Sequence, residues 1–355
     1  MLGLIILLGL GIYLLFAAVN VFLIFFTGVL LAVFLRGLTN GLKERTGWSD
    51  KLSLTLVTLS LAGLLTGLFF LLAPEIGKQT DQLSEQLPKA VEQLQEKIQS
   101  NEWGRRVIGQ QPAFTDLMKQ IPNALSRAGL LLSSTLGLLV NLVVVVSVGI
   151  YLASAPDVYV NGVAQLFPKP QRKRSREVMA ELGITLQRWL NGRMFLMLTN
   201  GIVTWLGLLM MGVPLALTLG LIAGLLNFIP NIGPILAAIP AVLVALMEGP
   251  DKVIHVLVFY VVYQMVDGYV LTPLVEKRTV SLPPALTITA QVLMGVLLGT
   301  LGVLLATPIV AVGLVLTKMV YIQDILGQDT DLPGERHSQK KADQLQGKRE
   351  PRSSV

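Results

Sequence analysis

The chain has 355 residues, of which 53% are hydrophobic and only 14% are charged, with a mean hydropathy of +0.66 and a net charge of +6. Soluble domains carry about 25% charged residues, so this composition predicts an all-α, polytopic membrane protein rather than a globular enzyme. With no cysteine, two distant histidines and no GxxxxGK[ST] sequence, the chain is expected to hold no metal, no cofactor, no catalytic residues and no ATP-driven motor of its own.

The first hydrophobic stretch contains no charge from residue 1 to residue 34, which is longer than the roughly 20 residues that one membrane helix needs. We therefore predict two helices that break near Asn20. A third helix is predicted at 52–73, so residues 1–73 form a group of N-terminal transmembrane helices. The stretch lacks a basic start and a small-residue cleavage site, which favours a retained membrane segment over a removed signal peptide.

Residues 74–130 form a polar segment between two hydrophobic ones. Within 75–99, apolar residues recur every three or four positions, which predicts an amphipathic helix. These residues are Leu83, Leu87, Val91, Leu94 and Ile98. The segment is interpreted as an extracytoplasmic helical insertion. It either caps the membrane domain as a helical hairpin or serves as an oligomer contact or external gate.

A transmembrane helix is predicted at 131–154, followed by a basic cytoplasmic segment at 155–192. Within this segment, residues 171–192 predict a basic amphipathic helix that contains Trp189. Such a helix is expected to lie along the cytoplasmic interface, where anionic lipid headgroups attract it. Simple anchoring explains the pattern better than a specific regulatory partner does.

Residues 193–320 contain an internal repeat. The sequence Pro-Leu-Ala-Leu-Thr that begins at Pro214 recurs as Pro-Pro-Ala-Leu-Thr at Pro283, 69 residues later. Gly233 matches Gly302 at the same offset. Each copy runs apolar after its opening, breaks near a glycine and resumes, which predicts a helical hairpin in the membrane.

Each hairpin follows a longer helix, so the two repeat units cover 193–247 and 253–317. Because the helix at 253–273 crosses the membrane between the two hairpins, the units are predicted to have inverted topology, an arrangement typical of secondary transporters. Two full-length helices in each copy would preserve the same topology. Re-entrant hairpins and full spans therefore both remain open for 214–247 and 283–317.

The densest local signal is the break in the first hairpin, GLLNFIPNIGP at 224–234. Proline removes a backbone donor, glycine permits positive φ, and asparagine side chains can replace lost backbone partners. One interpretation is a substrate or ion site made by Asn227, Pro230, Asn231 and Gly233. The other is a structural turn with its caps.

Asp267 is the one charged residue that we place inside a hydrophobic membrane segment, the run from His255 to Pro273. An ionisable group at membrane depth costs several kcal/mol unless it is paired or hydrated, so it is a candidate functional group by default. Tyr260, Gln264 and Asp267 fall at i, i+4 and i+7, and Tyr263 lies four residues before Asp267, which predicts a polar stripe on one helix face. Such a stripe must face protein or water rather than lipid.

At these residues the chain resembles the autoinducer-2 exporter family of bacterial and archaeal membrane transporters. The matching sequences are GLLNFIPNIGPILAAIP at 224–240, YQMVDGYVLTPLV at 263–275, VSLPPALTI at 280–288 and GVLLGTLGVLLATPIVAV at 295–312. The resemblance covers about residues 1–320 and is specific over 214–312. It implies passive or ion-coupled export, with autoinducer-2 or sodium/proton exchange for some members, and a homo-oligomer for which a pentamer is the suggested size. The acidic position in this pattern is usually Glu, and here it is Asp267.

We therefore predict a multi-pass transporter, or permease, that exports a small polar solute across the cell membrane. Its site would lie among the break at 227–234, Gln264 and Asp267, and the polar positions Thr287 and Gln291 of the second hairpin. Asp267 would carry a proton or a sodium ion, because a carboxylate can change its charge state as access alternates. Two other classes remain open: an oligomeric channel with uncoupled flux, and a membrane scaffold that transports nothing.

Positive charges predict the orientation of the chain in the membrane. If the hydrophobic segments alternate, 20 of the 28 Lys and Arg residues fall on one side. This side is predicted to be cytoplasmic and to hold both termini, including a disordered tail at 321–355. The distribution of charge indicates orientation and contact with membrane lipids rather than a nucleic-acid partner.

Because the native chain has no cysteine, single-cysteine labelling can test this orientation cleanly. A Ser100→Cys variant should react with a membrane-impermeant maleimide added to intact cells, since 74–130 is predicted to be external. A Ser338→Cys variant in the predicted cytoplasmic tail is the matched control and should react only after permeabilisation. Labelling of Ser100→Cys from the cytoplasmic side alone would overturn the assignment.

Overall fold

The computed structural model describes residues 2–67, 135–276 and 282–328, with isolated residues at 69, 70, 74, 78, 82, 279 and 280. All regular elements in these ranges are helical, which confirms the all-α class. The amphipathic helix predicted within 75–99 and most of the predicted tail lie outside the described residues. The predicted start of that tail at 321 is wrong, because the π-helix η3 (Thr317–Ile325) continues to Ile325.

Four helices of the described part are long and apolar enough to cross a membrane. They cover Ala18–Thr46, Lys169–Met210, Asp251–Glu276 and Pro284–Ile325. A fifth span results if α5 (Thr135–Ser154) and α6 (Pro156–Gln165), which meet at a bend of 86°, are counted as one. The protein is therefore a multi-pass membrane protein.

The first helix, α1 (Leu2–Thr46), is continuous over 45 residues, so the predicted break near Asn20 is wrong. Sharp breaks in helices need a proline, a glycine pair or an inserted group, and residues 2–46 contain no proline. Asn20 keeps its own backbone donor, so a polar side chain alone does not end the helix.

The chain folds into two compact units, of which unit 1 comprises residues 1–59, 141–193 and 272–355. Its core joins α1 to α7 (Arg172–Met210) and α12 (Pro284–Leu316) through large apolar side chains. These are Leu23, Phe26 and Leu30, packed with Leu186 and Leu305. Small residues bring α1 close to α5, because a Cβ on Gly28 would lie 2.6 Å from Val148 Cγ1.

A charged cluster ties three helices of unit 1 together at one end. Arg36 of α1 donates to Asp50 at 2.7 Å and to the carbonyl of Ser154, the last residue of α5, at 3.4 Å. Asp50 begins the next helix, at 50–67, and lies 3.5 Å from Lys43. The Arg36 guanidinium, hydrogen-bonded to the Asp50 carboxyl, lowers the pKa of that carboxyl.

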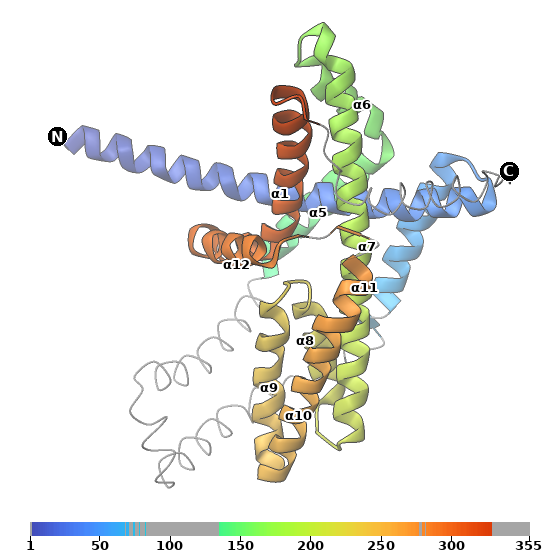
Figure 1. Ribbon diagram of the computed structural model, residues 1–355, viewed down its shortest axis with the longest axis vertical. Coiled ribbons are helices and arrows are strands. Elements are labelled where there is room, and N and C mark those ends of the chain that lie inside the picture. Colours follow the sequence, from blue (N-terminus) through green and yellow to red (C-terminus); the bar gives the residue numbers. More distant parts are fainter. Residues whose placement is uncertain are drawn as a thin grey trace, which may run out of the picture. The chain divides into compact units, whose positions relative to one another are not determined.

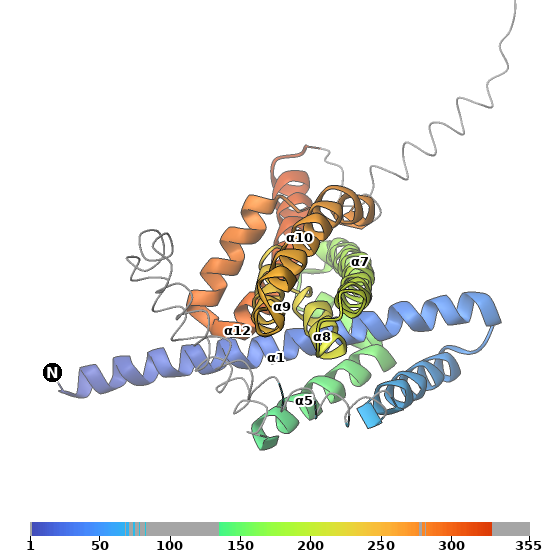
Figure 2. The same cartoon turned by 90° about the horizontal axis from the view of Figure 1, so that it is seen from below.

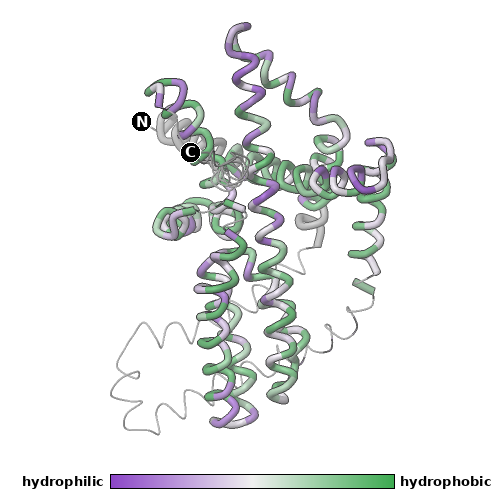
Figure 3. Tube along the Cα trace, turned by 45° about the vertical axis from the view of Figure 1, so that its right-hand side comes forward, coloured by the Kyte–Doolittle hydropathy of each residue, from purple (hydrophilic) through white to green (hydrophobic). Residues whose placement is uncertain are grey.

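Unit 2 includes residues 194–271 and is a bundle made by the second half of α7 with α8 (Ala216–Leu226), α9 (Ile232–Glu248) and α10 (Pro250–Val266) (Figures 1 and 2). Leu208, Leu219, Val244 and Val256, one from each helix, are all almost fully buried in its core. The helices are mainly hydrophobic along their length, and hydrophilic residues gather at the turn between α9 and α10 (Figure 3).

The helix α7 is continuous from Arg172 to Met210, so the basic helix predicted at 171–192 and the membrane helix predicted to follow it form one helix, although the two compact units divide at residue 193. Trp189, expected at the membrane interface, is 6% exposed and packs inside the protein. The helix ends beyond Met210 in a Schellman-type turn. There Gly212 has φ of 66° and the Val213 N–H donates to the Leu208 carbonyl.

A tight helical hairpin occurs in both predicted repeat copies. In the first, a Cβ on Gly233 would overlap the carbonyl of Leu226 across the turn between α8 and α9. In the second, Gly299 interrupts α12 with φ of 65° and ψ of −149°, and a Cβ on Gly302 would overlap the carbonyl of Met294. Glycine is required because the two legs approach backbone to backbone. The inverted orientation of the two hairpins remains a prediction.

A Gly302→Ala variant should destabilise the protein by about 1–3 kcal/mol, because the new methyl group forces the two legs of α12 apart. Gly313→Ala on the same helix is the matched control, since a Cβ there meets nothing within 4 Å. Thermal unfolding of the purified variants in detergent measures the difference. Equal melting temperatures for the two variants would contradict the close approach at Gly302.

Candidate functional site

The break between α8 and α9 lies where the sequence predicts it. Pro230 has no N–H to continue the helix, and Asn231 takes a positive φ of 65° just before α9 begins. Backbone N–H groups of the turn donate to carbonyls a few residues earlier, for instance Ile229 to Leu226 and Gly233 to Ile229. The backbone therefore reverses within a few residues while most of its polar groups remain bonded.

The two asparagines of the break have different environments. Asn227 is 2% exposed, and its Nδ2 donates to the carbonyl of Leu196 on α7 at 3.1 Å. Asn231 is exposed. Asn227 therefore fixes the break to α7, as a structural cap would, whereas the Asn231 side chain remains exposed.

The position of the break also depends on a close crossing of α7 and α8. A Cβ on Gly224 would lie 3.0 Å from the carbonyl of Met197 and 3.1 Å from the Cα of Gly201. Gly220 approaches Gly201 and Trp205 of α7 in the same way. Small residues at both faces let the two backbones come together, as is common between membrane helices.

The buried polar face of α10 differs in part from the predicted stripe. Tyr260, Tyr263 and Asp267 are each less than 9% exposed, whereas Gln264 is exposed. Of the predicted stripe, Tyr260, Tyr263 and Asp267 are therefore buried and Gln264 is not. Both residues lie within one helical turn of Asp267, so spacing alone does not separate them.

The two tyrosines are held by aromatic and polar contacts. The Tyr260 hydroxyl donates to the carbonyl of Ala237 on α9 at 3.5 Å. The ring of Tyr263 stacks on that of Phe259, with centroids 6.2 Å apart. Its buried hydroxyl has no hydrogen-bond partner among the described residues. A buried hydroxyl without a partner is costly, so it marks a place where a water or a polar solute is favoured.

Asp267 lies where the regular helix α10 ends. It is 6% exposed and is the first residue of the π-helix η2 (Asp267–Leu271), after which α11 (Thr272–Glu276) continues. A π-helical turn adds one residue to the normal turn, changes the register of the following side chains and often occurs at functional sites. The buried carboxylate thus coincides with a local irregularity of its helix.

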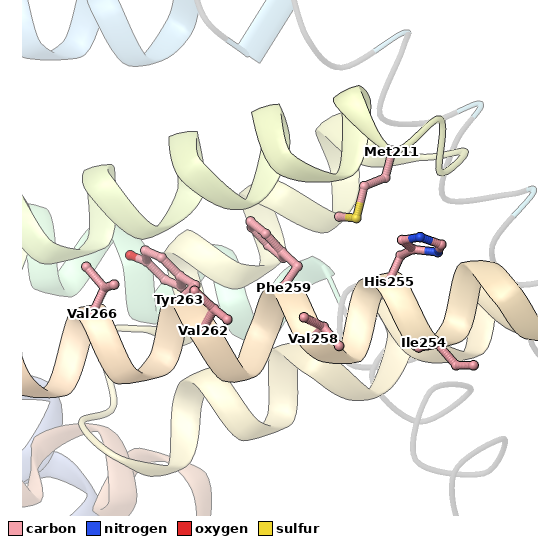
Figure 4. A pocket seen from close by; sticks show the side chains of 8 residues that line it. All are labelled: Met211, Ile254, His255, Val258, Phe259, Val262, Tyr263 and Val266. Carbon is pink, nitrogen blue, oxygen red and sulfur yellow. The ribbon is translucent and has the colours of Figure 1, made fainter.

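An open cavity of about 610 Å³ lies along α10 from Ile254 to Val266, next to the end of α7 (Figure 4). It is lined by Met211, Ile254, His255, Val258, Phe259, Val262, Tyr263 and Val266. His255 Nδ1 lies 2.6 Å from the carbonyl of Asp251, and the other lining side chains are almost all apolar. Tyr263, which belongs to the buried polar face, also lines this cavity. The cavity itself suits apolar rather than polar occupants.

The predicted site residues of the second hairpin belong to unit 1, whereas those of the break and of α10 belong to unit 2. Gln291 is fully buried, and its Nε2 lies 3.5 Å from the hydroxyl of Thr307 on the other leg of α12. Thr287 is 4% exposed and donates to the carbonyl of Pro283. The two groups thus belong to different units, and a joint site remains a prediction.

Sequence reasoning missed a buried polar row on α7. Asn200 and Thr204 are 3% and 0% exposed, and the Thr204 hydroxyl donates to the Asn200 side-chain oxygen at 3.1 Å. They follow Leu196 at intervals of four residues, so all three share one helix face. Thr218 of α8 is also buried. The spacing of uncharged polar residues in an apolar helix could have revealed this row, but a search for charged residues does not detect it.

Arg193 is a second buried charge, at 8% exposure, although the sequence places it at the end of a hydrophobic segment. Glu276, at the end of α11, attracts it electrostatically. Both residues belong to unit 1. Asp267 is therefore not the sole buried charge of the described part of the chain.

Comparisons with known proteins agree on one family. Residues 2–321 match the family described as "AI-2E family transporter". The chain is 27% identical over 276 residues to "Putative transport protein YueF" of Bacillus subtilis (strain 168), an alignment that covers 74% of each chain. It is 30% identical over 202 residues to "AI-2 transport protein TqsA" of Escherichia coli (strain K12), covering 55% of this chain and 53% of that protein.

The contrast between buried and exposed residues of the break can be tested by labelling. In an Asn231→Cys variant, the thiol should react with small methanethiosulfonate reagents, because the native side chain is exposed. Ala241→Cys, at a fully buried position of α9 and with a small change in volume, is the control and should stay protected. Protection of Asn231→Cys equal to that of Ala241→Cys would show that the break is a closed structural turn.

Proposed function

Since the chain belongs to the AI-2E transporter family, we propose that it is a secondary transporter that exports a small polar solute across the cytoplasmic membrane. Membrane transport itself follows from the family and from the membrane-length helices. The names of the relatives likewise refer to transport rather than to catalysis. The solute, the direction of flux and the coupling ion are what the proposal adds.

The observation that carries the proposal is the buried carboxylate of Asp267 at the start of a π-helical turn. A carboxylate costs free energy at membrane depth and is retained there when it has a task, such as binding a proton or a sodium ion. Binding of either ion would neutralise the group and change the cost of exposing it to each side in turn. This is the property that a coupled exporter needs.

The break between α8 and α9 supports a polar solute site in the same unit. Asn231 offers an amide, and α9 begins one residue later with the partial positive charge of its N-terminus. Half-helix ends of this kind bind polar or anionic groups of substrates in many transporters. The Tyr263 hydroxyl, which has no hydrogen-bond partner among the described residues, adds a further polar group on α10.

Autoinducer-2 is the first solute to test, because the relative TqsA is named as an AI-2 transport protein. The proposal includes a homo-oligomer with both termini in the cytoplasm. An oligomeric channel would carry the same solute without coupling, so the direction and strength of gradient-driven flux separate the two.

An Asp267→Asn variant should fold and assemble normally but lose gradient-driven transport, because the amide keeps the shape and removes titration. Asp267→Glu should retain part of the activity. The measurement is flux of autoinducer-2 and a panel of small polar solutes into or out of liposomes, with imposed proton or sodium gradients.

The matched control is Asp251→Asn, which removes an exposed carboxylate from the first turn of the same helix and should leave the flux unchanged. Gradient-driven flux of wild-type strength in Asp267→Asn would remove the coupling role. Flux that ignores the imposed gradients in the wild-type protein would favour a channel.

A further inference from the structure

The short helix α6 leaves the membrane helix α5 at a sharp angle. The two helices meet at Ala155 with a bend of 86°, and α6 has 10 residues. At 1.5 Å per residue α6 is only about 15 Å long, half of the roughly 30 Å needed to cross a bilayer. If α5 crosses the membrane, α6 lies close to the plane of its surface.

One face of α6 and its C-cap is apolar and exposed. Val158 and Leu166 are 67% and 84% exposed, and Tyr159 and Val163 are 43% and 45% exposed. Val158 and Leu166 are eight residues apart and form one row along the helix. Tyr159 and Val163 are four residues apart and form a second row beside it, so all four side chains lie on one arc. On the other side Ala164 is fully buried against the protein.

Positive charges begin where this apolar face ends. Lys169 of η1 (Lys169–Gln171) and Lys173 and Arg176 of α7 are all exposed. Arg172 instead donates to the carbonyls of Phe167 at 3.2 Å and Gln165 at 3.4 Å, which satisfies the C-terminal end of α6 and fixes it to α7. The acidic residues nearest in sequence are Asp157 and Glu177.

A further arginine holds the basic segment against the protein. Arg174 lies 3.0 Å from Asp324 and 3.3 Å from Glu177, and it also donates to the carbonyl of Met319. Beneath it, Val178 packs with Val315 and Met319. Glu177 and Asp324 form ion pairs with Arg174. They therefore do not neutralise Lys169, Lys173 and Arg176 through that contact.

We propose that α6 and the basic residues after it form a surface anchor for anionic phospholipids. The apolar face of Val158, Tyr159, Val163 and Leu166 enters the boundary between headgroups and acyl chains. Lys169, Lys173 and Arg176 contact the phosphates of the same leaflet. An apolar arc followed at once by clustered basic residues is the composition that binds such a surface. The anchor thus lies at α6 rather than at Trp189, which is buried.

The depth of α6 can be measured on the full-length protein in vesicles of phosphatidylethanolamine and phosphatidylglycerol. A fluorophore on Leu166→Cys should be quenched by nitroxide-labelled lipid and shielded from aqueous iodide. Asn161→Cys, on the opposite arc of α6, is the control and should be less quenched by the lipid. Quenching of the Leu166→Cys label by iodide would overturn the proposal. Shielding from both quenchers would overturn it too, because protein, such as a second copy, would then cover the face.

The role of charge needs a separate comparison. In the wild-type background, lipid quenching of the Leu166→Cys label should increase with the fraction of phosphatidylglycerol. The triple change Lys169→Gln, Lys173→Gln and Arg176→Gln should abolish most of this increase. Arg45→Gln with Lys51→Gln, two exposed basic residues elsewhere in unit 1, is the control and should retain it. An equal response to phosphatidylglycerol in the triple variant would refute the headgroup contact.

Discussion

The structure depends on the need to satisfy backbone hydrogen bonds where no water is available. An apolar helix meets this need by itself, so every interruption at membrane depth has to be compensated by neighbouring groups. At the turn around Pro230, local turn contacts and the Asn227 side chain provide the compensation, and Gly233 allows the backbones to approach. In α12 the close approach recurs at Gly302, next to the interruption at Gly299. Both hairpins therefore depend on glycine where their two legs approach each other.

The polar groups of unit 2 follow from a second constraint, the cost of burying them. The amide and hydroxyl of Asn200 and Thr204 bond to each other, and the hydroxyl of Tyr260 reaches a carbonyl of α9. The buried carboxylate of Asp267 is more expensive than any of these groups. It lies at a π-helical turn, where the register of α10 changes. A transport role gives a reason for keeping such a group where a purely structural helix would not.

Unit 1 combines membrane helices with a charged surface. Arg36, Arg172 and Arg174 each bond to carbonyl groups at or near the ends of helices, so these arginines connect elements that apolar packing alone would leave loosely held. The basic residues that remain exposed lie beside the apolar face of α6. With the proposed lipid anchor, this one basic run would serve the fold through Arg172 and Arg174 and the membrane surface through its exposed residues.

The sequence alone determined the helical class, the membrane location, the family and the break between α8 and α9, because these depend on composition and on local backbone chemistry. Pro230 lacks the N–H that would continue a helix, and Gly302 could be paired with Gly233 from spacing alone. Only the tertiary structure decided which side of α10 is buried, since Tyr263 and Gln264 are adjacent and both within a turn of Asp267. It also decided that α1 and α7 are continuous, that Trp189 faces protein, and that α6 turns away from α5 with its apolar face exposed. These properties depend on which neighbours each helix meets, and the spacing of residues along one segment does not contain that information.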